Sequence, residues 1–421
     1  MPKPLSEIAQ VNPQVNLPSG AVASTPVTFV SMSDVTESGD WIGHQVRKLS
    51  DVRSGFTVFA DGDVLVAKIT PCFENGKGAH VVGLTNGVGF GSTEFHVLRA
   101  RDAVSPRYVY HVTQSARLRK AAEAYMSGSA GQRRVPREFF DVFNVPDLAR
   151  QEQQQISVIL DTLDTTIRQT EAIIEKLKQV KQGLLHDLLT RGIDANGELR
   201  PLQSEAPHLY KESPLGWIPR EWPVELLDDI AVRGSGHTPS KIVPSYWNGG
   251  IRWVSLADSH RLDQIYIRET DKEISELGVA NSSAVRHPAG TVVLSRDAGV
   301  GKSAVLASEM AVSQHFMAWR CGERLNNLYL YFKLQQLKPT FESIAVGSTI
   351  KTIGLDYFKK LRISVPARSE QDKVVEVMMV TEADIRNQES EFRKLRLLKA
   401  GLMDDLLTGR VRVTSLLDTA P

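Results

Sequence analysis

Apolar residues recur at alternating steps of four and three along two stretches of the chain. The first stretch carries this pattern at Ile156, Leu160, Leu163, Ile167, Thr170, Ile174, Leu177, Lys181, Leu184 and Leu188. The second carries it at Val374, Met378, Thr381, Ile385, Gln388, Phe392, Leu395, Lys399, Leu402 and Leu406. Such spacing predicts a long amphipathic helix in each stretch. Neither stretch contains proline, and a run of about 35 residues at 1.5 Å per residue would reach roughly 50 Å.

The two predicted helices are copies of one another. Gly183-Leu-Leu-His-Asp-Leu-Leu-Thr190 recurs as Gly401-Leu-Met-Asp-Asp-Leu-Leu-Thr408, and Glu152-Gln153 recurs as Glu370-Gln371, both displaced by 218 positions. Each pattern has a polar residue at its fifth position and a lysine at its eighth, an interruption of the kind that fixes the register between partner helices. The matched lengths favour an antiparallel pair within the chain, with separate dimerisation helices as the alternative.

The blocks that precede the helices have a different pattern. Short runs rich in β-branched residues alternate with Gly, Pro, Asn and Asp, as at 62–69, 94–98, 290–294 and 316–320. Segments 108–125 and 328–343 have helical character between them. Each block therefore predicts a mixed α/β domain with twisted strands. The segment from Asp194 to Pro214 has three prolines and no apolar period, which predicts an exposed linker.

These elements predict an α+β fold: two similar mixed α/β domains separated by two long antiparallel coiled-coil helices, with an internal pseudo-two-fold repeat. The predicted boundaries, in chain order, are a first domain at 1–150, a first long helix at 151–191, a linker at 192–213, a second domain at 214–368, a second long helix at 369–410 and a C-terminal tail at 411–421.

Length and composition exclude several classes of protein. A chain of 421 residues suggests two or three domains, and 42% hydrophobic residues is typical of globular proteins. A net charge of +1 argues against a protein that coats nucleic acid through an overall positive potential. The sequence has no apolar run of membrane-spanning length and no signal peptide pattern, and Cys72 and Cys321 are too few for a disulfide framework. We therefore expect no membrane association and a cytoplasmic location.

The segment Arg296-Asp-Ala-Gly-Val-Gly-Lys-Ser303 partly matches a phosphate-binding loop. Arg296 stands where that motif needs its first glycine, and the corresponding Gly76-Lys-Gly-Ala79 of the first half lacks the hydroxyl that holds magnesium. A turn between strands with an exposed lysine is the favoured interpretation. A nucleotide hydrolase using 299–303 and a purely structural coiled-coil adaptor remain alternatives. The sequence has no metal-ligand spacing and no catalytic motif.

A glycine-rich polar segment, Gly128-Ser-Ala-Gly-Gln-Arg-Arg-Val-Pro-Arg137, has a counterpart in Gly347-Ser-Thr-Ile-Lys-Thr352. Arginine and glutamine suit the edges of guanine and adenine, whereas Ser, Thr and Lys suit phosphates. For any single residue, a solvated surface loop is the alternative. The predicted DNA contacts are Lys68, Lys77, Ser129, Gln132, Arg133, Arg134, Arg137, Thr238, Arg296, Lys302, Ser348, Thr349, Lys351 and Thr352.

Nearly the whole chain resembles the specificity subunit of type I restriction-modification systems. The most specific motif is Pro-x(4–6)-Gln-x(2)-Ile/Val opening a long helix that ends in Leu-Leu-Thr, here at 146–191 and 366–409. The entry Leu215-Gly-Trp-Ile-Pro-Arg-Glu-Trp222 and Gly236-His-Thr-Pro-Ser240 also carry the resemblance. The first half departs from the family pattern, because it lacks the Trp-Ile-Pro lead-in and a Gly-x-Thr-Pro equivalent.

The resemblance implies a non-catalytic DNA reader without a cofactor of its own. Each target-recognition domain would read one half of an asymmetric, interrupted site on double-stranded DNA. The helices would dock two methyltransferase subunits, which carry S-adenosylmethionine, and restriction subunits with helicase and nuclease motors can join them. Residues beside the helix seam are the predicted partner contacts, with packing inside the helical pair as the alternative: Ile159, Val180, Leu185, Leu189, Val377, Leu398, Met403 and Leu407.

Overall fold

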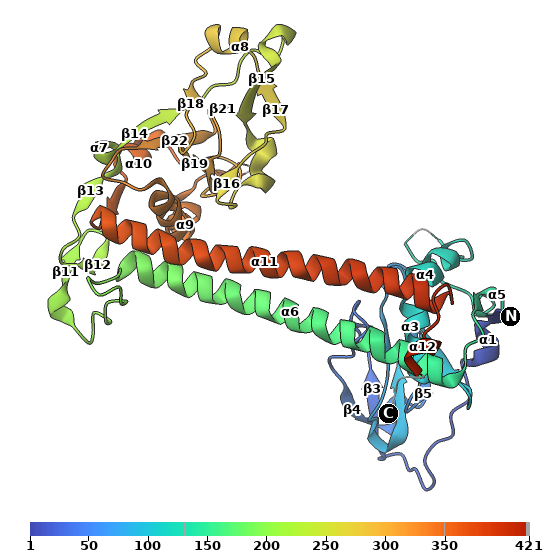
Figure 1. The fold of residues 1–421 in the computed structure, drawn as a ribbon. Helices are drawn as coiled ribbons and strands as arrows, with labels where there is room; N and C mark the ends of the chain where they lie inside the picture. Colours follow the sequence, from blue (N-terminus) through green and yellow to red (C-terminus); the bar gives the residue numbers. More distant parts are fainter. Residues whose placement is uncertain (130, 349, 418–421) are drawn as a thin grey trace. The chain divides into compact units, whose positions relative to one another are not determined.

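The computed structural model describes residues 1–129, 131–348 and 350–417, which form two compact units. Unit 1 comprises Met1–Ala172 and Glu389–Pro421, and unit 2 comprises Ile173–Gln388. Each unit therefore contains one mixed α/β domain together with one half of each long helix (Figure 1). The tail predicted at 411–421 is described only as far as residue 417.

The domain of unit 1 is built on two four-stranded sheets. The first has the order β2 (Ala9–Val11), β9 (Phe95–Ala100), β6 (Val64–Ala67), β7 (Gly78–His80). The second has the order β4 (Gln45–Lys48), β3 (Pro26–Val30), β8 (Val88–Gly91), β5 (Thr57–Ala60). The chain's first strand, β1 (Lys3–Pro4), pairs with β10 (Asn144–Val145), and short helices α1 (Leu5–Ile8), α2 (Leu49–Val52) and α5 (Phe139–Val142) complete the domain.

The domain of unit 2 repeats this pairing with one strand added. A five-stranded sheet has the order β14 (Ala231–Ser235), β22 (Phe316–Cys321), β19 (Val292–Ser295), β20 (Ser303–Leu306), β16 (Tyr266–Ile267). A four-stranded sheet has the order β17 (Lys272–Ile274), β15 (Trp247–Val254), β21 (Met310–Val312), β18 (Arg286–His287). The four-stranded sheet of unit 2 and the second sheet of unit 1 share a parallel pair among antiparallel neighbours, β15 with β21 and β3 with β8, and the added strand β16 pairs parallel with β20. The predicted internal repeat is confirmed.

One helical segment of each domain packs against its first sheet. The segment predicted as one helix at 108–125 is two, α3 (Pro106–Gln114) and α4 (Ala116–Glu123). The break occurs at Ser115, whose hydroxyl accepts a hydrogen bond from the Leu118 amide and so begins a new helix. The counterpart in unit 2, α9 (Asn327–Ile344), is continuous.

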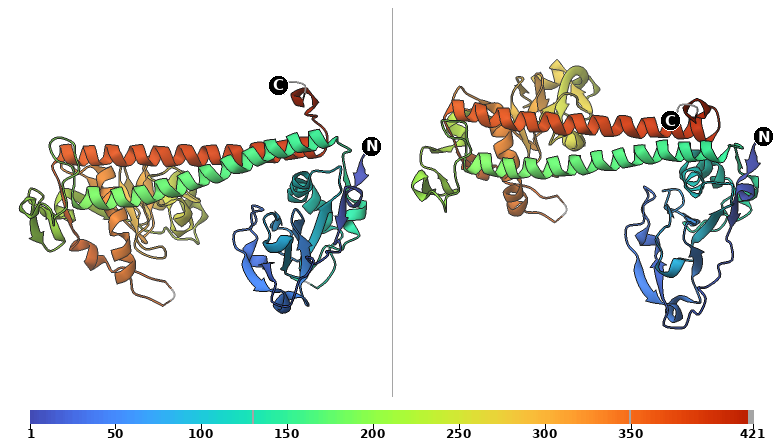
Figure 2. Two further views of the ribbon diagram at one scale, coloured as in Figure 1. Left: turned by 90° about the horizontal axis from the view of Figure 1, so that it is seen from below. Right: turned by 60° about the horizontal axis from the view of Figure 1, so that its bottom comes forward.

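The two long helices are α6 (Arg150–Thr190) and α11 (Arg368–Leu407), and in each unit their segments lie side by side (Figures 1 and 2). In unit 1 Lys399 forms an ion pair with Asp164, and in unit 2 Lys181 forms one with Glu382. Each lysine and each carboxylate lies 218 residues from its equivalent, so the two ion pairs are one contact made twice. The lysine at the eighth seam position therefore forms an ion pair between the two helices in each unit, a contact of the kind that fixes register.

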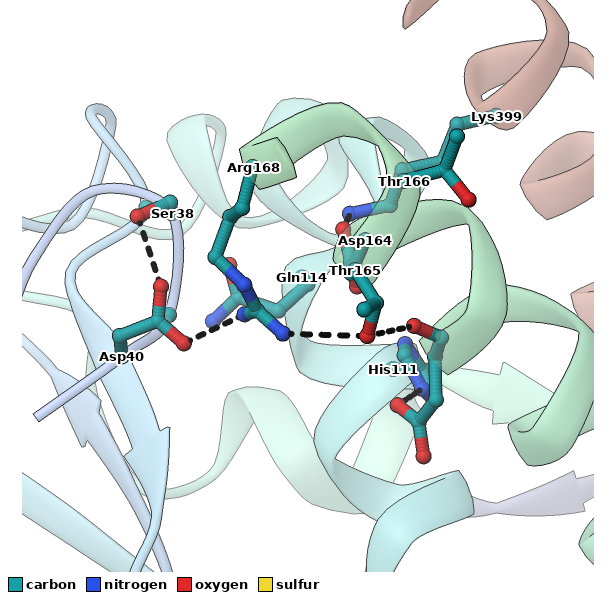
Figure 3. Close-up of polar contacts among 12 residues, drawn as sticks. Ser38, Asp40, His111, Gln114, Asp164, Thr165, Thr166, Arg168 and Lys399 are labelled. Carbon is teal, nitrogen blue, oxygen red and sulfur yellow. Dashed lines mark hydrogen bonds and ion pairs between the residues drawn. The ribbon is translucent and has the colours of Figure 1, made fainter. Parts of the chain in front are cut away.

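Figure 3 shows this contact in unit 1, where Asp164 of α6 faces Lys399 of α11. One turn along α6, the Arg168 guanidinium donates to Asp40 of the α/β domain at 2.7 Å. Buried apolar residues lie along the long helices in both units, Ile156 and Leu160 in unit 1 and Ile174 and Ile385 in unit 2, each less than a tenth exposed. Within the part of the chain that the structure describes, no helix is long and apolar enough to cross a membrane.

The repeated Gln of the Glu-Gln pair joins each domain to its own helix. The Gln153 side chain accepts from the Ser105 amide at 2.9 Å and donates to the Leu148 carbonyl at 2.9 Å. Gln371 accepts from the Asn326 amide at 2.8 Å and donates to Pro366 at 2.9 Å. Since Ser105 and Asn326 are the N-caps of α3 and α9, each long helix begins on the helix that covers its sheet.

The repeated Glu joins each helix to the segment that follows the other helix. Glu152, only 3% exposed, accepts two hydrogen bonds from Arg412, at 2.8 and 2.5 Å. Glu370 accepts from Arg200 at 2.5 Å, from the Ile193 amide at 2.9 Å and from the Trp222 indole at 3.2 Å. A buried carboxylate needs such partners to offset its lost hydration.

This contact corrects the prediction of an exposed linker at 192–213. The segment is ordered: β11 (Tyr210–Ser213) pairs with β12 (Gly216–Pro219), and Ile193 and Tyr210 are buried. This order could not be predicted from a local pattern, because its anchor is a pair of charged residues, Arg200 and Glu370, 170 residues apart, rather than an apolar period.

Reversing the charge of Lys399 tests the seam contact. Lys399→Glu would set a second carboxylate against Asp164 at side chains that are only 20% and 10% exposed. We expect the free energy of unfolding to fall by about 2–4 kcal/mol, and the double exchange Asp164→Lys with Lys399→Glu to recover most of it. Urea unfolding of the full chain, followed by circular dichroism, measures both.

The matched control is Lys394→Glu, since Lys394 is 73% exposed and its ion-pair partner is Glu391 on its own helix. Its effect should stay within about 0.5 kcal/mol. Equal losses at Lys394 and Lys399 would contradict a register set by the seam ion pairs.

Candidate nucleic-acid interface

The two polar segments predicted from the sequence occupy equivalent places in the two domains. In unit 1, Arg134 forms antiparallel bridges with Ser127 and with Ile69. In unit 2, Thr352 forms them with Val346 and with Asp297. We call segments 127–134 and 346–352 the first and second polar hairpins. Each has its base pinned to the turn that follows the central strand of its sheet, β6 or β19.

The leading glycine of each hairpin is required by its geometry. Gly128 and Gly347 have φ values of 125° and 130°, which residues with side chains rarely adopt. A Cβ at these positions would come within 2.8 Å of the Gln132 carbonyl oxygen and 2.2 Å of the Ile350 carbonyl oxygen. The recurrent Gly-Ser therefore marks a shared tight turn. Ala130 and the predicted contact Thr349 lie outside the described residues.

Arg134 braces the first polar hairpin. Its guanidinium forms a two-pronged ion pair with Glu94, with Nη2 to Oε1 at 2.8 Å and Nε to Oε2 at 3.0 Å. This pairing lowers the pKa of Glu94 and raises that of Arg134. The Lys68 amide donates to the Glu94 carbonyl at 2.8 Å, so Lys68 is beside the same pair.

Other side chains of the first hairpin are free to reach a ligand. Arg133 is 44% exposed, and its nearest carboxylate oxygen, on Glu74, is 3.9 Å away. Ser129, Gln132 and Arg137 are exposed. Arg134 and Arg133 are neighbours with different roles: one holds the hairpin to Glu94, and the other extends from it.

Arg296 takes the bracing role in unit 2. Its Nε donates to the Gln314 carbonyl and its Nη1 to the Ile353 carbonyl, both at 3.2 Å. The neighbouring Asp297 accepts from the His315 ring at 2.7 Å. Thr238 donates its hydroxyl to the Gln314 side chain at 2.5 Å. The structure thus brings Thr238, Arg296 and the second hairpin together around Gln314.

The second hairpin itself presents Ser348 and Lys351 to solvent, both exposed. The Lys351 carbonyl accepts from the Ala298 amide at 3.2 Å, which ties the backbone while the ammonium extends away. Thr352 is partly buried at the base of the hairpin. The exposed groups of the two hairpins therefore differ, with Ser129, Gln132 and Arg133 in the first and Ser348 and Lys351 in the second, while Arg137 is exposed just beyond the first.

Lys77 and Lys302 have matching structural contacts. Each lies at the end of a turn between two antiparallel strands, β6 to β7 or β19 to β20. Lys77 Nζ donates to the Met32 carbonyl at 3.1 Å, and Lys302 Nζ to the Ser259 carbonyl at 3.0 Å. These carbonyls belong to the 3-10 helices η1 (Met32–Asp34) and η5 (Leu256–Arg261). Both predicted DNA contacts therefore hold a loop in place.

The same geometry removes the phosphate-loop alternative. A phosphate-binding loop connects a strand to the N-terminus of a helix. Here residues 296–302 connect β19 to the antiparallel strand β20, as the turn interpretation predicted. Lys302 is half-buried rather than exposed, because its ammonium reaches Ser259.

The sequence interpretation missed Glu94, Gln314 and His315. Ser92-Thr-Glu-Phe95 and Ser313-Gln-His-Phe316 lead into equivalent strands, β9 and β22. A Ser-x-polar-Phe motif at the same place in both halves was the available signal. Polar residues directly before a buried strand lie at the sheet edge, which here is where the hairpins are pinned.

The predicted partner contacts divide into three groups. Val180, Val377 and Leu398 are exposed by 42%, 37% and 51%, whereas Ile159 and Met403 are partly buried against the core of unit 1. The other three predicted partner contacts are core residues instead, which corrects that prediction. Each is at most 5% exposed and packs against the α/β domain of its own unit: Leu185, Leu189 and Leu407. Exposed apolar residues on the helices that the sequence interpretation missed are Val158, Ile173, Val380 and Leu397.

Comparison with known proteins identifies the family. A model of the type I restriction modification DNA specificity domain matches residues 19–179 and 219–391, one match over each half of the repeat. The chain therefore belongs to this family. The matched ranges cover both domains and most of each long helix.

Curated relatives agree with this assignment. The specificity subunit of the type I restriction enzyme EcoAI of Escherichia coli is 35% identical over 190 residues, which cover 44% of this chain and 32% of that protein. The HindI specificity subunit of Haemophilus influenzae is 23% identical over 447 aligned positions, covering 91% of this chain and 94% of that protein. The alignments with the two Escherichia coli relatives span about a third of the length of each.

Solved structures share the fold. A chain from a study of complex assembly and conformational transition in the type I R-M system matches with a TM-score of 0.61 at 18% identity, covering 98% of both chains. The HsdS subunit from Thermoanaerobacter tengcongensis matches with a TM-score of 0.51 at 17% identity, covering 98% of this chain and 97% of that one.

The division between bracing and exposed residues predicts different effects on stability. The Arg296 side chain is only 18% exposed, and Arg296→Ala removes the donor that two backbone carbonyls share. We expect a loss of about 1–3 kcal/mol in the free energy of unfolding. Lys351→Ala, at an exposed site, should change it by less than about 0.5 kcal/mol. Thermal or urea unfolding compares the two, and an Arg296 variant as stable as the wild type would show that Arg296 does not brace the loop.

Proposed function

We propose that this chain is the specificity subunit of a type I restriction-modification system. Its two domains read the two halves of one asymmetric, interrupted site on double-stranded DNA. The observation that carries the proposal is the recurrence of a braced polar hairpin at the same place in two domains that belong to this family. A loop anchored at its base, with exposed hydrogen-bonding side chains, is suited to reading base edges in the major groove.

Different residues on the two hairpins support an asymmetric site. The first hairpin offers Gln132 and Arg133, and Arg137 is exposed just beyond it, all with side chains that suit guanine and adenine. The second offers Ser348 and Lys351, and Gln314 lies beside it. Two domains with one framework and unlike side chains would read unlike half-sites.

The chain acts without catalysis of its own in this proposal. Two methyltransferase subunits, which carry S-adenosylmethionine, would dock on the helices, and restriction subunits with helicase and nuclease activities can join the complex. Val180 and Leu398 support the docking surface, since they are equivalent by the repeat and both are exposed. The net charge of +1 is consistent with a subunit that shares DNA clamping with its partners.

Selection of duplexes from a random pool by the assembled complex tests the proposal. Replacing Arg133 and Arg137 with alanine should relax preference at one half-site only, and Lys351→Ala should weaken binding through the other domain. Loss of a base contact costs about 1–3 kcal/mol, so discrimination at the affected position should fall roughly 5- to 150-fold. Lys394→Ala on the exposed face of α11 is the control. A wild-type complex that binds selected and random duplexes equally would refute the function.

A further inference from the structure

A pocket of about 400 Å³ opens beside the second polar hairpin, inside unit 2. The buried ring of Trp253 and the side chain of Leu256 contribute apolar surface to it. Lys241, Lys272 and Gln314, all exposed, also line it. The pocket therefore combines an apolar wall with basic, hydrogen-bonding groups at its opening.

The charge of this pocket is of one sign. Among the described residues that line it are two lysines and one histidine and no carboxylate. Within the described part of the chain, neither the Lys241 nor the Lys272 ammonium has a hydrogen bond or an ion pair. This contrasts with Lys77 and Lys302, whose ammonium groups are engaged. Two uncompensated cations at the opening of one pocket favour an anionic ligand.

A buried hydroxyl in the pocket has no partner. Ser313 is 1% exposed, and its amide donates to the Val254 carbonyl at 2.8 Å, but its Oγ forms no hydrogen bond with any described residue. Most buried polar atoms are hydrogen-bonded, because leaving one unpaired costs free energy. Ser313 lines the pocket, so a ligand oxygen there could accept from it.

The pocket is continuous with the proposed reading surface. Gln314 lines the pocket, accepts from Thr238 through its side chain, and is held through its carbonyl by Arg296. The Arg296 carbonyl in turn accepts from the Ile353 amide at the base of the second hairpin. A DNA strand read by this hairpin would therefore pass beside the pocket.

The first domain has a different arrangement at the same place. Trp253 pairs with Lys272 across β15 and β17, whereas Phe29, its equivalent in the repeat, pairs with Gln45 across β3 and β4. The equivalent of Ser313 is Ser92, whose hydroxyl accepts from the Glu94 amide at 3.2 Å. The basic pocket with a free hydroxyl is thus a feature of the second domain.

We propose that this pocket binds one deoxyribose-phosphate unit of the DNA strand that the second domain reads. Lys241 and Lys272 contact the phosphate, Ser313 donates to one of its oxygens, and the sugar lies against Trp253. This inference rests on the proposed function. Such a contact fixes the position of the domain on the duplex without reading sequence.

Salt dependence of binding tests this inference in the assembled complex. The double variant Lys241→Gln with Lys272→Gln should reduce the slope of log K against log salt by about 0.9, the contribution of the one neutralised phosphate that the pocket would hold. Affinity for the selected duplex and for a random duplex should fall by the same factor. Preference among bases should stay unchanged. Ser313→Ala should weaken both duplexes by about 3- to 10-fold without changing the slope.

The matched control is Lys359→Gln with Lys360→Gln, the same loss of charge at two exposed lysines near the end of α10 (Leu355–Lys359) in the same domain. It should leave the slope within 0.5 of the wild type, a limit of roughly half a phosphate contact. An unchanged slope in the Lys241 and Lys272 variant refutes the pocket, and so does a changed base preference, which would mean that the pocket reads a base. Competition by inorganic phosphate beyond its effect on ionic strength would instead indicate a site for free phosphate. Failure of the wild-type complex to discriminate between duplexes refutes the proposed function, whereas these pocket outcomes leave it standing.

Discussion

The duplicated ion pair in the helix seam is the constraint on which the other features depend. A lysine and a carboxylate that are both largely buried cannot shift by one helical turn without leaving a charge buried and unpaired, so the pair selects one register. The Glu-Gln at the start of each helix then ties that register to a recognition domain on one side and to the following segment on the other. Each unit is thereby fixed internally by a few polar contacts that the repeat supplies twice.

A few polar contacts also hold the polar loops in place. Some cations, such as Arg134, Arg296, Lys77 and Lys302, bond to the protein itself and hold the loops. Others, such as Arg133 and Lys351, remain exposed on the loops so held. A loop that is already held in place loses little conformational freedom when it binds DNA. Less of the binding free energy is then offset by ordering the loop, and more of it can distinguish one base sequence from another. Residues of one chemical type thus serve two purposes, and only their partners distinguish them.

Much of the fold could be predicted from the sequence because it is periodic or repeated. The steps of four and three gave both long helices, and the recurrence of Glu152-Gln153 at Glu370-Gln371 gave the two-part architecture. The order around Arg200 could not be predicted, because one ion pair across 170 residues leaves no local pattern. For the same reason the sequence could not separate Arg133 from Arg134, or find the burial of Leu185 and Leu189 against the domain core. Composition identified the polar loops. Which of their side chains hold a loop and which remain exposed depends on contacts with residues far away in the sequence.

The central claim is that two unlike domains read two half-sites. Sequencing of the methylated positions in DNA exposed to the assembled complex, with and without this chain, measures it most directly. We expect methylation in the presence of the chain at one motif made of two different short half-sites separated by a spacer of constant length. Methylation at a single uninterrupted motif, or at the same positions without the chain, would contradict it.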